Sequence, residues 1–492
     1  MLPSHFVVGL MWLRRLHQSR NLIFCGIMTA DPAQAVSIPS GILRSYDIRG
    51  TVPNQLSAAV VKQLGRAFGT RVVRAGGQRV SVGRDGRLSS PMLEEALVEG
   101  LAACGLTVER IGLGPTPMLY YADAVNRTDG AIMLTGSHNP ADYNGMKIVL
   151  GGKPFYGDDI QDLRRIIVEN DYAPAATGAI HTVSVTEDYI DRLAAELQDM
   201  RPLNVVWDCG NGAAGEVVQC LTNRLPGRHT VLFGEIDGRF PNHHPDPTEP
   251  HNLVDLQRAV AAQQADLGIA FDGDGDRIGV VDARNRIAWG DQILLLFARE
   301  VLAQQPGAPI IADVKASQVL FDGVAAAGGI PVMYRTGHSL IKSKMKEIGA
   351  PLAGEMSGHI FFADRYYGFD DALYAAVRLL RLVSEGAPGW LAEQIDALPK
   401  VWNTPELRID CADDRKFVVV DMLKDHLRAK GVSFNETDGV RADTAAGWWL
   451  LRASNTQPIL VARCEAQSEA GLKAVGRDLQ NWLSVFGINF RM

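Results

Sequence analysis

The sequence predicts an α/β fold made of three similar α/β units followed by a separate α+β unit. Short apolar runs alternate with amphipathic stretches from Ile42 onward, which is the pattern of a mostly parallel sheet with helices between its strands. At 492 residues the chain is too long for one hydrophobic core, and about three or four domains are expected. After about Pro399 the apolar runs become shorter, which favours an antiparallel sheet in a C-terminal domain of its own.

The first unit shows the strand–helix–strand order most clearly. Residues 79–85 are predicted to form a strand, residues 89–105 a helix, and residues 106–114 a second strand. Ser90 is the expected N-cap and Pro91 the first helical residue, because a serine oxygen can accept from a free amide and a proline needs no acceptor there.

The same order returns twice further along the chain. Residues 203–221 and 308–329 each contain a strand, a turn and a helix, so three similar units in a row are the simplest interpretation. Candidate linkers are residues 169–179, the stretch near 282–286, and residues 386–400.

Composition limits the class of protein. Hydrophobic residues make up 47% of the chain and charged residues 21%, as in an ordinary soluble globular protein. The formal net charge of −7 argues against a nucleic-acid partner, which needs a basic face, but allows a small anionic ligand held by local cations. The six cysteines lack a CxxC spacing and fit neither a disulfide framework nor a zinc knuckle, so we expect a cytoplasmic protein. They are Cys25, Cys104, Cys209, Cys220, Cys411 and Cys464.

The beginning of the chain carries a separate expectation. The apolar run from Phe6 to Leu13 is too short to span a membrane, and the arginines that follow it are in the wrong order for a secretory signal. A polar segment opens at Met28. We therefore expect no membrane association, and we expect the first 27 residues to be an upstream-start artefact or a disordered arm.

Ser137 is predicted to lie on a loop at the end of a strand. The apolar run from Ala131 to Leu134 is followed by Thr-Gly-Ser-His-Asn-Pro, in which Gly, Asn and Pro favour a turn. Open α/β sheets keep their chemistry at such strand ends. The alternative is that Ser137 only helps to form the turn.

An acidic loop follows another apolar run. Asp272, Asp274 and Asp276 alternate with glycines, and three carboxylates this close repel one another unless a cation lies among them. An EF-hand fits poorly, because Arg277 stands where glycine is needed and Ala283 where the bidentate glutamate is needed. The remaining alternative is a solvated acidic turn.

Two further polar loops are weaker signals when taken alone. The segment 354–362 places Glu355, Ser357 and His359 before a predicted strand. Glutamate and serine can bind sugar hydroxyls, and histidine can move a proton near neutral pH, although a lone histidine is more often structural.

The second of these loops spans residues 452–458 and follows the apolar run 448–451. Arg452, the polar side chains after it and the loop amides could hold a phosphate monoester, although a surface turn would look similar.

Taken together, the polar loops resemble the α-D-phosphohexomutases, and within them the phosphomannomutase/phosphoglucomutase branch. The resemblance covers nearly the whole chain from about Ile38, and the motifs occur in the expected order. They are "SYDIRG" at 45–50, "TGSHNP" at 135–140, "DGDGDR" at 272–277, "RTGHSLIK" at 335–342, "GEMSGH" at 354–359 and "RASNTQP" at 452–458.

The resemblance implies a four-domain α/β enzyme: three similar α/β domains with mixed sheets and a C-terminal α+β domain, arranged around one central cleft. We expect an N-terminal extension over residues 1–37 that lies outside this fold. The expected domains carry the serine loop, the metal loop, the sugar loop and the phosphate loop, and they span residues 38–182, 183–284, 285–398 and 399–492.

The resemblance also assigns roles to these loops. It implies that Ser137 is a phosphoserine in the resting enzyme and binds one Mg²⁺ per chain together with Asp272, Asp274 and Asp276. A phosphoserine carries roughly −1.5 to −2 charge, which a divalent ion would offset.

Two cations and one histidine complete the implied catalytic set. Arg277 and Lys147 would stabilise the phosphoryl group during transfer, and Lys147 and His359 are the candidates for general base and acid.

The implied substrate contacts come from all four domains. The phosphate loop departs from the family in ending Gln457-Pro458 where Glu-Pro is common, which we expect to tune the site and not to abolish function. The implied substrate-binding residues are Tyr46, Arg49, Lys315, His338, Glu355, Ser357, Arg452, Ser454, Asn455 and Thr456.

The implied reaction interconverts hexose 6-phosphate and hexose 1-phosphate through a bound 1,6-bisphosphate, with glucose 1,6-bisphosphate as activator. Met356 and Asn455 distinguish the loops from those of phosphoglucosamine mutases and favour mannose and glucose phosphates, between which the sequence does not choose. A phosphoglucosamine mutase, a non-catalytic sugar-phosphate sensor and a metal-dependent phosphatase remain as alternatives. The expected partners are small hexose phosphates, and the expected state is a monomer, with a dimer as the alternative.

Overall fold

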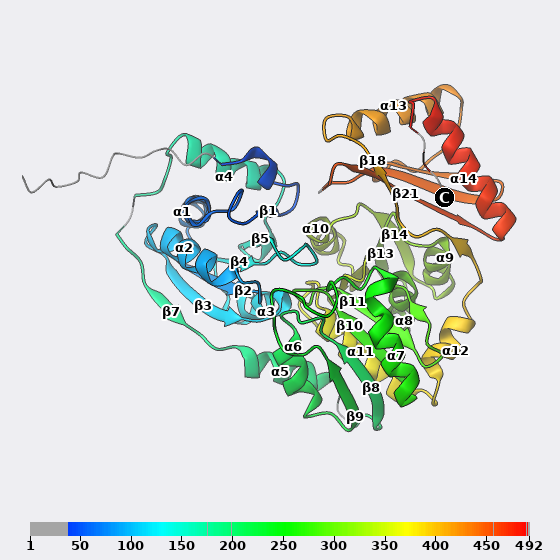
Figure 1. The fold of residues 1–492 in the computed structure, drawn as a ribbon, viewed down its shortest axis with the longest axis horizontal. Coiled ribbons are helices and arrows are strands. Elements are labelled where there is room, and N and C mark those ends of the chain that lie inside the picture. The colour runs from blue at the N-terminus through cyan, green and yellow to red at the C-terminus, as the bar shows by residue number, and fades with distance from the viewer. Residues whose placement is uncertain (1–37, 175, 198, 456, 489, 491–492) are drawn as a thin grey trace, which may run out of the picture. The chain divides into compact units, whose positions relative to one another are not determined.

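The computed structural model describes residues 38–492 apart from 175, 198, 456, 489, 491 and 492 (Figure 1). The expected N-terminal extension over residues 1–37 lies outside the described residues. Within the described part of the chain, no helix combines the length and the apolar character that a membrane span requires.

The first sheet is mixed. Its elements follow a short 3₁₀ turn at Ser40–Ile42 and are β1 (Ile48–Thr51), α1 (Ala58–Arg74), β2 (Arg79–Arg84), α2 (Ser90–Ala102), β3 (Thr107–Leu113), α3 (Thr116–Asn126), β4 (Gly130–Leu134), β5 (Tyr143–Leu150), β6 (Lys153–Pro154), α4 (Asp158–Val168) and β7 (Ile180–Thr182). The strand order is β1-β5-β4-β2-β3-β7, with β6 paired to β5. Strands β4, β2, β3 and β7 run parallel, whereas β5 is antiparallel to both β4 and β1.

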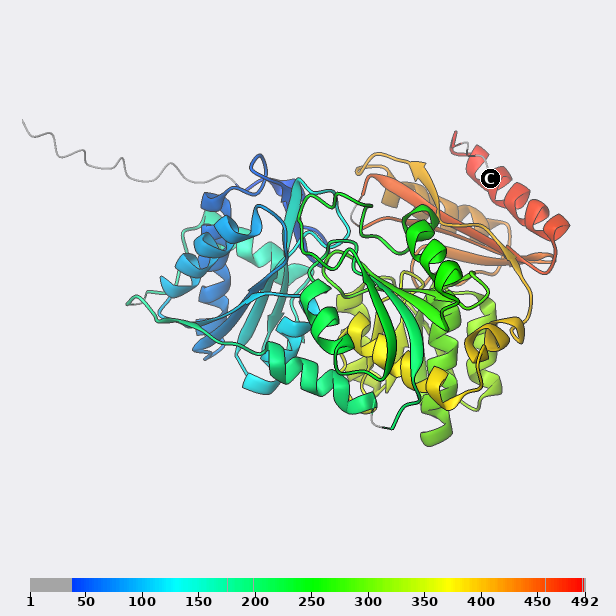
Figure 2. The ribbon, with the colours of Figure 1, turned by 60° about the horizontal axis from the view of Figure 1, so that its bottom comes forward.

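The second sheet is also mixed. Its elements are α5 (Thr186–Ala194), a 3₁₀ turn (Ala195–Leu197), β8 (Leu203–Asp208), α6 (Gly215–Thr222), β9 (Gly227–Leu232), a 3₁₀ turn (Pro250–Leu253), α7 (Val254–Gln263), β10 (Leu267–Phe271), β11 (Ile278–Asp282) and β12 (Ile287–Ala288). The strand order is β12-β11-β10-β8-β9, and these strands lie side by side in green in Figure 2. Strand β10 is parallel to β8 and antiparallel to β11.

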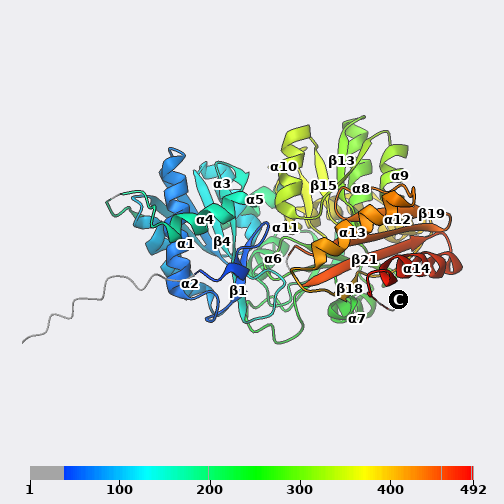
Figure 3. The same ribbon diagram turned by 90° about the horizontal axis from the view of Figure 1, so that it is seen from above.

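The third sheet has the order β14-β13-β15-β16, with only the last pair antiparallel. Its elements are α8 (Gly290–Gln304), β13 (Pro309–Asp313), α9 (Gln318–Ala326), β14 (Ile330–Tyr334), α10 (His338–Ile348), β15 (Leu352–Gly354), β16 (Ile360–Phe362), α11 (Ala372–Glu385) and α12 (Trp390–Asp396). Helix α10 covers one face of the sheet and α8 and α9 the other, as Figure 3 shows. The buried residues alternate between these two faces because successive strand residues point to opposite sides.

The C-terminal sheet is antiparallel throughout, in the order β17-β21-β20-β19 with β18 paired to β21. Its elements are β17 (Trp402–Asn403), β18 (Leu407–Asp410), α13 (Lys416–Ala429), β19 (Val440–Thr444), β20 (Gly447–Ala453), β21 (Ile459–Ala466) and α14 (Glu469–Ser484). Helices α13 and α14 pack on one face of this sheet. On the other face Trp448 and Leu450 pack against Val314, which follows β13. The fold is therefore the predicted one: three α/β/α domains with mixed sheets and a C-terminal domain with an antiparallel sheet.

Three local predictions were wrong. Ser89, not Ser90, precedes the first turn of α2 as its N-cap, because the Ser90 hydroxyl donates to Asp85 Oδ1 at 2.6 Å. The expected linker near 282–286 is the turn of the β11–β12 hairpin, in which Asp282 accepts hydrogen bonds from the amides of Arg284 and Arg286 at 2.9 Å.

The expected linker at 386–400 contains helix α12, which forms because two of its residues have a packing partner. Leu391 and Ala392 are buried, and Leu391 joins the large core that also contains α8 and α11.

Asp371 joins the second and third units. It is the N-cap of α11, where its carboxylate accepts a hydrogen bond from the Tyr374 amide at 2.8 Å. The same carboxylate accepts from the hydroxyls of Tyr189 on α5 at 2.9 Å and Tyr366 at 2.8 Å. Burial raises the pKa of Asp371 to about 6, although these hydrogen bonds act in the opposite direction.

We expect Tyr189→Phe to destabilise the protein more at pH 8 than at pH 5. At pH 8 Asp371 is charged, and a lost hydrogen bond to a charged group costs about 2 kcal/mol. At pH 5 the folded protein holds Asp371 protonated, and the loss costs about 1 kcal/mol. Thermal unfolding of the variant and the wild type at both pH values measures the difference, and equal shifts in Tm at pH 5 and pH 8 would contradict it.

Candidate active site

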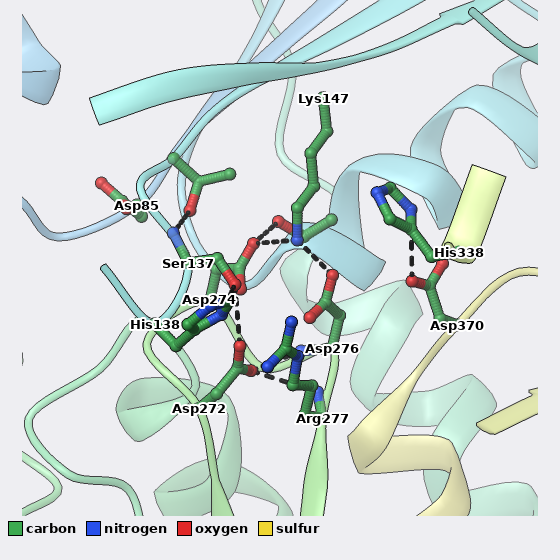
Figure 4. Close-up of polar contacts among 12 residues, drawn as sticks. Asp85, Ser137, His138, Lys147, Asp272, Asp274, Asp276, Arg277, His338 and Asp370 are labelled. Carbon is green, nitrogen blue, oxygen red and sulfur yellow. Dashed lines mark hydrogen bonds and ion pairs between the residues drawn. The ribbon is translucent and has the colours of Figure 1, made fainter. Parts of the chain in front are cut away.

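Ser137 lies on the loop between β4 and β5, as predicted, and is 2% exposed. Its φ of +48° is in the left-handed region that residues other than glycine rarely adopt. The hydroxyl donates to Asp272 Oδ2 at 2.9 Å and lies 3.2 Å from His138 Nδ1. This conformation directs the serine oxygen toward the acidic loop (Figure 4).

The acidic loop joins β10 to β11, and its three aspartates are fully buried. One carboxylate oxygen from each of Asp272, Asp274 and Asp276 lies within 4.8 Å of the others, which makes the loop a candidate metal site. Among the described residues, Oδ1 of Asp274 and Oδ1 of Asp276 have no hydrogen-bond partner. Buried carboxylate oxygens with free lone pairs are the ligands that a hard divalent cation prefers, so the donor set fits Mg²⁺.

The acidic loop and the serine loop approach each other closely at Gly273. A Cβ at this position would lie 2.4 Å from the carbonyl oxygen of Ser137. Only glycine therefore allows the two loops to meet at this distance.

Lys147 on β5 neutralises part of the acidic charge. Its Nζ donates to Asp274 Oδ2 at 2.7 Å and also contacts Asp276. Burial alone would lower the pKa of the ammonium, but the three carboxylates of the acidic loop raise it above its ordinary value. Burial also opposes ionisation of Asp274, yet Lys147 holds the pKa of that carboxyl well below its usual range.

Burial and the charges of Asp274 and Asp276 raise the pKa of Asp272 well above its usual range. A single lysine therefore does not balance the negative charge of the three carboxylates, and a bound cation would supply the missing positive charge.

His359 lies between Arg277 and Asp370. Arg277 Nε donates to His359 Nε2 at 2.9 Å, which leaves the ring proton on Nδ1, 3.1 Å from Asp370 Oδ2. Lys342 Nζ donates to the other oxygen of Asp370 at 2.8 Å. Burial opposes the charge on Asp370, but Lys342 and the histidines hold its pKa well below the usual range.

His338, at the start of α10, stacks on His359 with a ring separation of 5.7 Å. Its Nδ1 lies 3.6 Å from Asp370 Oδ2. Burial and Lys342 lower the pKa of His338 well below the ordinary value. The rings of Tyr46 and His338 form a T-shaped contact with their centroids 5.6 Å apart, which joins the first and third units at this point.

The sugar-loop residues lie between β15 and β16. Glu355 is 4% exposed and accepts hydrogen bonds from the Gly337 amide and, at 3.2 Å, from Ser357 Oγ. Lys315 follows β13 and pairs with Glu406 at 2.7 Å. Burial opposes the charge of Lys315, but Glu406 and its neighbours raise the pKa of the ammonium.

The phosphate-loop residues begin at the end of β20, which contains Arg452, and continue into the loop after it. Arg452 is buried, and its Nε donates to Asp438 Oδ2 at 2.8 Å. Asp438 also accepts from the Thr336 amide at 3.1 Å, which connects the C-terminal domain to the third unit. Ser454 Oγ accepts from the Gln457 amide at 3.1 Å. Asn455 is half-buried on the same loop, and Thr456 lies outside the described residues.

Arg49 contacts the serine loop, and Tyr46 lies near the phosphate loop. Arg49 donates to Asn139 Oδ1 at 2.7 Å, and Asn139 is two residues beyond the serine. Burial and Asp47 raise the pKa of the Tyr46 hydroxyl, while Arg452 lowers it, so Tyr46 lies within electrostatic reach of the phosphate loop.

Sequence reasoning missed two groups in this site. Asp370 precedes α11, and its only sequence signal is the pair of adjacent aspartates at 370–371. His138 stands inside the serine motif and could have been named from that position alone. Burial and Arg277 lower the pKa of His138 well below its ordinary value, so it faces Ser137 as a neutral ring.

The fold and this set of loops define a known class. Four family models match the chain in order, described as domains I, II and III (alpha/beta/alpha) and the C-terminal domain of phosphoglucomutase/phosphomannomutase. They cover residues 41–173, 187–285, 289–401 and 406–480. The chain therefore belongs to the phosphoglucomutase/phosphomannomutase family.

Individual relatives agree with this class. The chain is 46% identical over 452 residues to the phosphomannomutase/phosphoglucomutase of Pseudomonas aeruginosa, covering 92% of this chain and 97% of the relative. It is 43% identical over 443 residues to a phosphoglucomutase of Neisseria gonorrhoeae, covering 89% and 96%. A crystal structure of a family protein from Burkholderia thailandensis, 43% identical, matches with a TM-score of 0.86 over 92% of this chain and all of that one.

We expect Asp274→Asn to weaken Mg²⁺ binding by at least about 10-fold, since residues that merely support metal ligands already contribute that much. Calorimetric titration of the purified protein with Mg²⁺ measures the effect. Asp364→Asn is the matched control, because Asp364 pairs with Arg378 at 3.0 Å on a different part of the third unit. An unchanged Mg²⁺ titration of Asp274→Asn would remove this aspartate from the site.

Proposed function

We propose that this protein interconverts hexose 6-phosphate and hexose 1-phosphate, with mannose or glucose as the sugar, through a phosphoserine at Ser137. The observation that carries the proposal is the hydrogen bond from Ser137 Oγ to Asp272 on the buried acidic loop. Lys147, on β5, donates to Asp274 of the same loop. A serine oxygen placed among carboxylates and cations suits a phosphoryl group that needs a metal and fixed positive charge.

In the proposed cycle, Ser137 gives its phosphoryl group to the free hydroxyl of a hexose monophosphate. The Oγ–P bond breaks, a bond forms from phosphorus to the sugar oxygen, and the hydroxyl proton passes to a base of the chain. The resulting 1,6-bisphosphate turns over within the site and returns its other phosphoryl group to Ser137. Glucose 1,6-bisphosphate would act as activator by restoring a lost phosphoserine.

The acidic loop is the proposed binding place of one Mg²⁺. Asp272, Asp274 and Asp276 would hold the ion together with the phosphoserine. When bound, it supplies positive charge that offsets the phosphoryl oxygens.

Two residues were candidates for the proton transfer. Lys147 keeps its proton, because the surrounding carboxylates raise its pKa, and this supports a role as a fixed cation beside the phosphoryl group. His359 is the other candidate for acid and base, and it lies between Asp370 Oδ2, 3.1 Å from its Nδ1, and Arg277 Nε, which donates to its Nε2. Arg277 would then stabilise the transferring group together with Lys147.

The other loops are proposed to bind the substrate in two orientations. Glu355 and Ser357 would bind sugar hydroxyls that look alike in both, and Lys315, His338, Tyr46 and Arg49 would contact the remaining substrate. One phosphate site must accept either end of the sugar. We propose that this phosphate site is formed by Arg452, Ser454, Asn455 and Thr456.

The relatives support mannose and glucose as substrates. The Pseudomonas relative is described as a phosphomannomutase/phosphoglucomutase and the Neisseria relative as a phosphoglucomutase.

The two other classes of function fit the site less well. A phosphatase would need a base to activate water. His138 Nδ1 lies 3.2 Å from Ser137 Oγ, and the Ser137 hydroxyl itself occupies that contact. A sensor has no use for the complete set of serine and metal ligands.

Further expectations complete the proposal. The enzyme is cytoplasmic and monomeric, with a dimer as the alternative, and binds neither nucleic acid nor membrane. The domain divisions at 182/183, 284/285 and 398/399 stay predictions.

We expect Ser137→Ala to lower mutase turnover by about 10³-fold or more, because the phosphoryl carrier is removed. Binding of glucose 1-phosphate, measured by calorimetry, should persist because the sugar and phosphate loops are intact. Ser81→Ala is the matched control, a buried serine of the same sheet that lies 3.4 Å from Thr128. Full mutase activity in Ser137→Ala would overturn the role of Ser137.

The proposed substrates are tested by assaying mannose 1-phosphate and glucose 1-phosphate side by side, with Mg²⁺ and a trace of glucose 1,6-bisphosphate. We expect comparable turnover of both, since these sugars differ only at C2. Turnover of glucose 1-phosphate alone would restrict the proposed substrate to glucose phosphates and make the protein a phosphoglucomutase. No turnover of either would redirect the assay to glucosamine phosphates and would contradict the proposal.

A further inference from the structure

Arg87 lies behind the serine loop, between β2 and α2, and is 1% exposed. All five N–H groups of its guanidinium have acceptors. Nε donates to Asp85 Oδ2 at 3.1 Å. The other four donate to backbone carbonyls of the serine loop and of the first residue of β5. Nη2 donates to Ser137 and Asn139, both at 2.7 Å, and Nη1 donates to Pro140 and, at 3.0 Å, to Tyr143 in β5.

The serine loop needs such a partner for its backbone. The carbonyls of Ser137 and Asn139 lie outside any helix or strand, and a buried carbonyl is costly if left unpaired. The Pro140 carbonyl also accepts from the Tyr143 amide at 3.0 Å. Ser137 itself is held in the left-handed region with φ +48°. A conformation of this kind persists only where the surroundings enforce it.

Asp85 extends the same support to the start of the loop. Its Oδ2 accepts from the Gly136 amide at 3.1 Å, and its Oδ1 accepts from the Arg87 amide at 3.1 Å. The two side chains therefore fix the backbone on both sides of Ser137. A Cβ at Gly136 would lie 2.4 Å from Arg87 Cζ, so the loop and the guanidinium are in direct contact.

The second unit closes the other side of Arg87. The ring of Phe240 lies 5.2 Å from the guanidinium carbon. A Cβ at Gly238 would lie 2.5 Å from Arg87 Cα. Arg87 is thus enclosed between the serine loop and a segment of the unit that carries the acidic loop.

We propose that Arg87 is a positioning residue that holds Ser137 in the orientation required to donate and to recover the phosphoryl group. This inference rests on the proposed function of Ser137 as phosphoryl carrier. Arg87 does not touch the reacting atoms; it acts through the backbone of residues 137–143. Lysine cannot replace it, because an ammonium has three donors and no planar fork, whereas Asp85 and the backbone of residues 137–143 together use five N–H groups in fixed directions.

The experiment compares full-length Arg87→Lys and Arg87→Ala with the wild type. Each protein is loaded with phosphate by glucose 1,6-bisphosphate, checked by intact mass, and mixed with glucose 1-phosphate under single-turnover conditions with rapid quenching. We expect transfer from phosphoserine to slow by about 100-fold per folded molecule, the effect of misplacing a reacting group by about 1 Å. The Kd for glucose 1-phosphate should stay within about twofold, because the sugar and phosphate loops are unchanged.

Two further readouts separate positioning from a purely structural role. Added guanidinium ion should restore part of the transfer rate in Arg87→Ala. The control is Arg378→Lys, another buried arginine, which pairs with Asp364 and with Glu300 at 2.6 Å on α11. We expect this control to lower Tm and to transfer phosphate at the wild-type rate per folded molecule.

A second variant, which keeps Arg87, tests the inference in case the Arg87 variants do not fold. Gly238→Ala pushes on the Arg87 backbone without removing a donor, and we expect it to slow the same step by a smaller factor. Wild-type transfer rates in folded Arg87→Lys, or in Gly238→Ala if the Arg87 variants do not fold, would overturn the inference. If the wild type itself carries no phosphate on Ser137, the proposed function fails, and this result is distinct from a failure of the Arg87 inference.

Discussion

Three fully buried carboxylates on one short loop are the constraint on which the rest of this site depends. Placing them together is unfavourable unless positive charge lies among them, and the chain provides only part of it through Lys147. Arg277 and the two histidines extend the charge network to Asp370, which Lys342 in turn supports. The serine hydroxyl completes the arrangement by donating to Asp272.

The fold brings these groups together by repeating one arrangement of strand and loop. In each of the three α/β units, a loop that follows a strand carries the polar groups, and glycine is used where the backbones approach most closely. Gly273 allows the acidic loop to touch the serine loop, and Gly275, with φ +73°, turns the acidic loop back toward β11. The antiparallel C-terminal sheet then packs Trp448 and Leu450 against the third unit, and its Asp438 connects Arg452 to Thr336.

Much of the site could be predicted because its signals are local. Ser137 and the three aspartates stand beside apolar runs and turn formers, so their place at strand ends follows from a few neighbouring residues. Asp370 carries no such signal, since its partners His359 and Lys342 lie 11 and 28 residues away. Arg87 is similar: its backbone acceptors are 50 to 56 residues further along the chain, and no sequence signal near residue 87 predicts them. The N-cap at Ser90 failed for a local reason, because its hydroxyl donates to Asp85, five residues earlier.

The sequence by itself determined the alternation of strands and helices, the number of α/β units, the antiparallel character of the last sheet, and which four loops form the candidate site. These properties depend on periodicity and on short motifs, which act over a few residues. Only the tertiary structure decided the hairpin at 282–286, the helix at 390–396, the Asp371 contact between α5 and α11, and the support of the serine loop by Arg87. The hairpin depends on the pairing of β12 with the neighbouring β11. The other three depend on partners that are distant in sequence, and such partners come together only after the chain has folded.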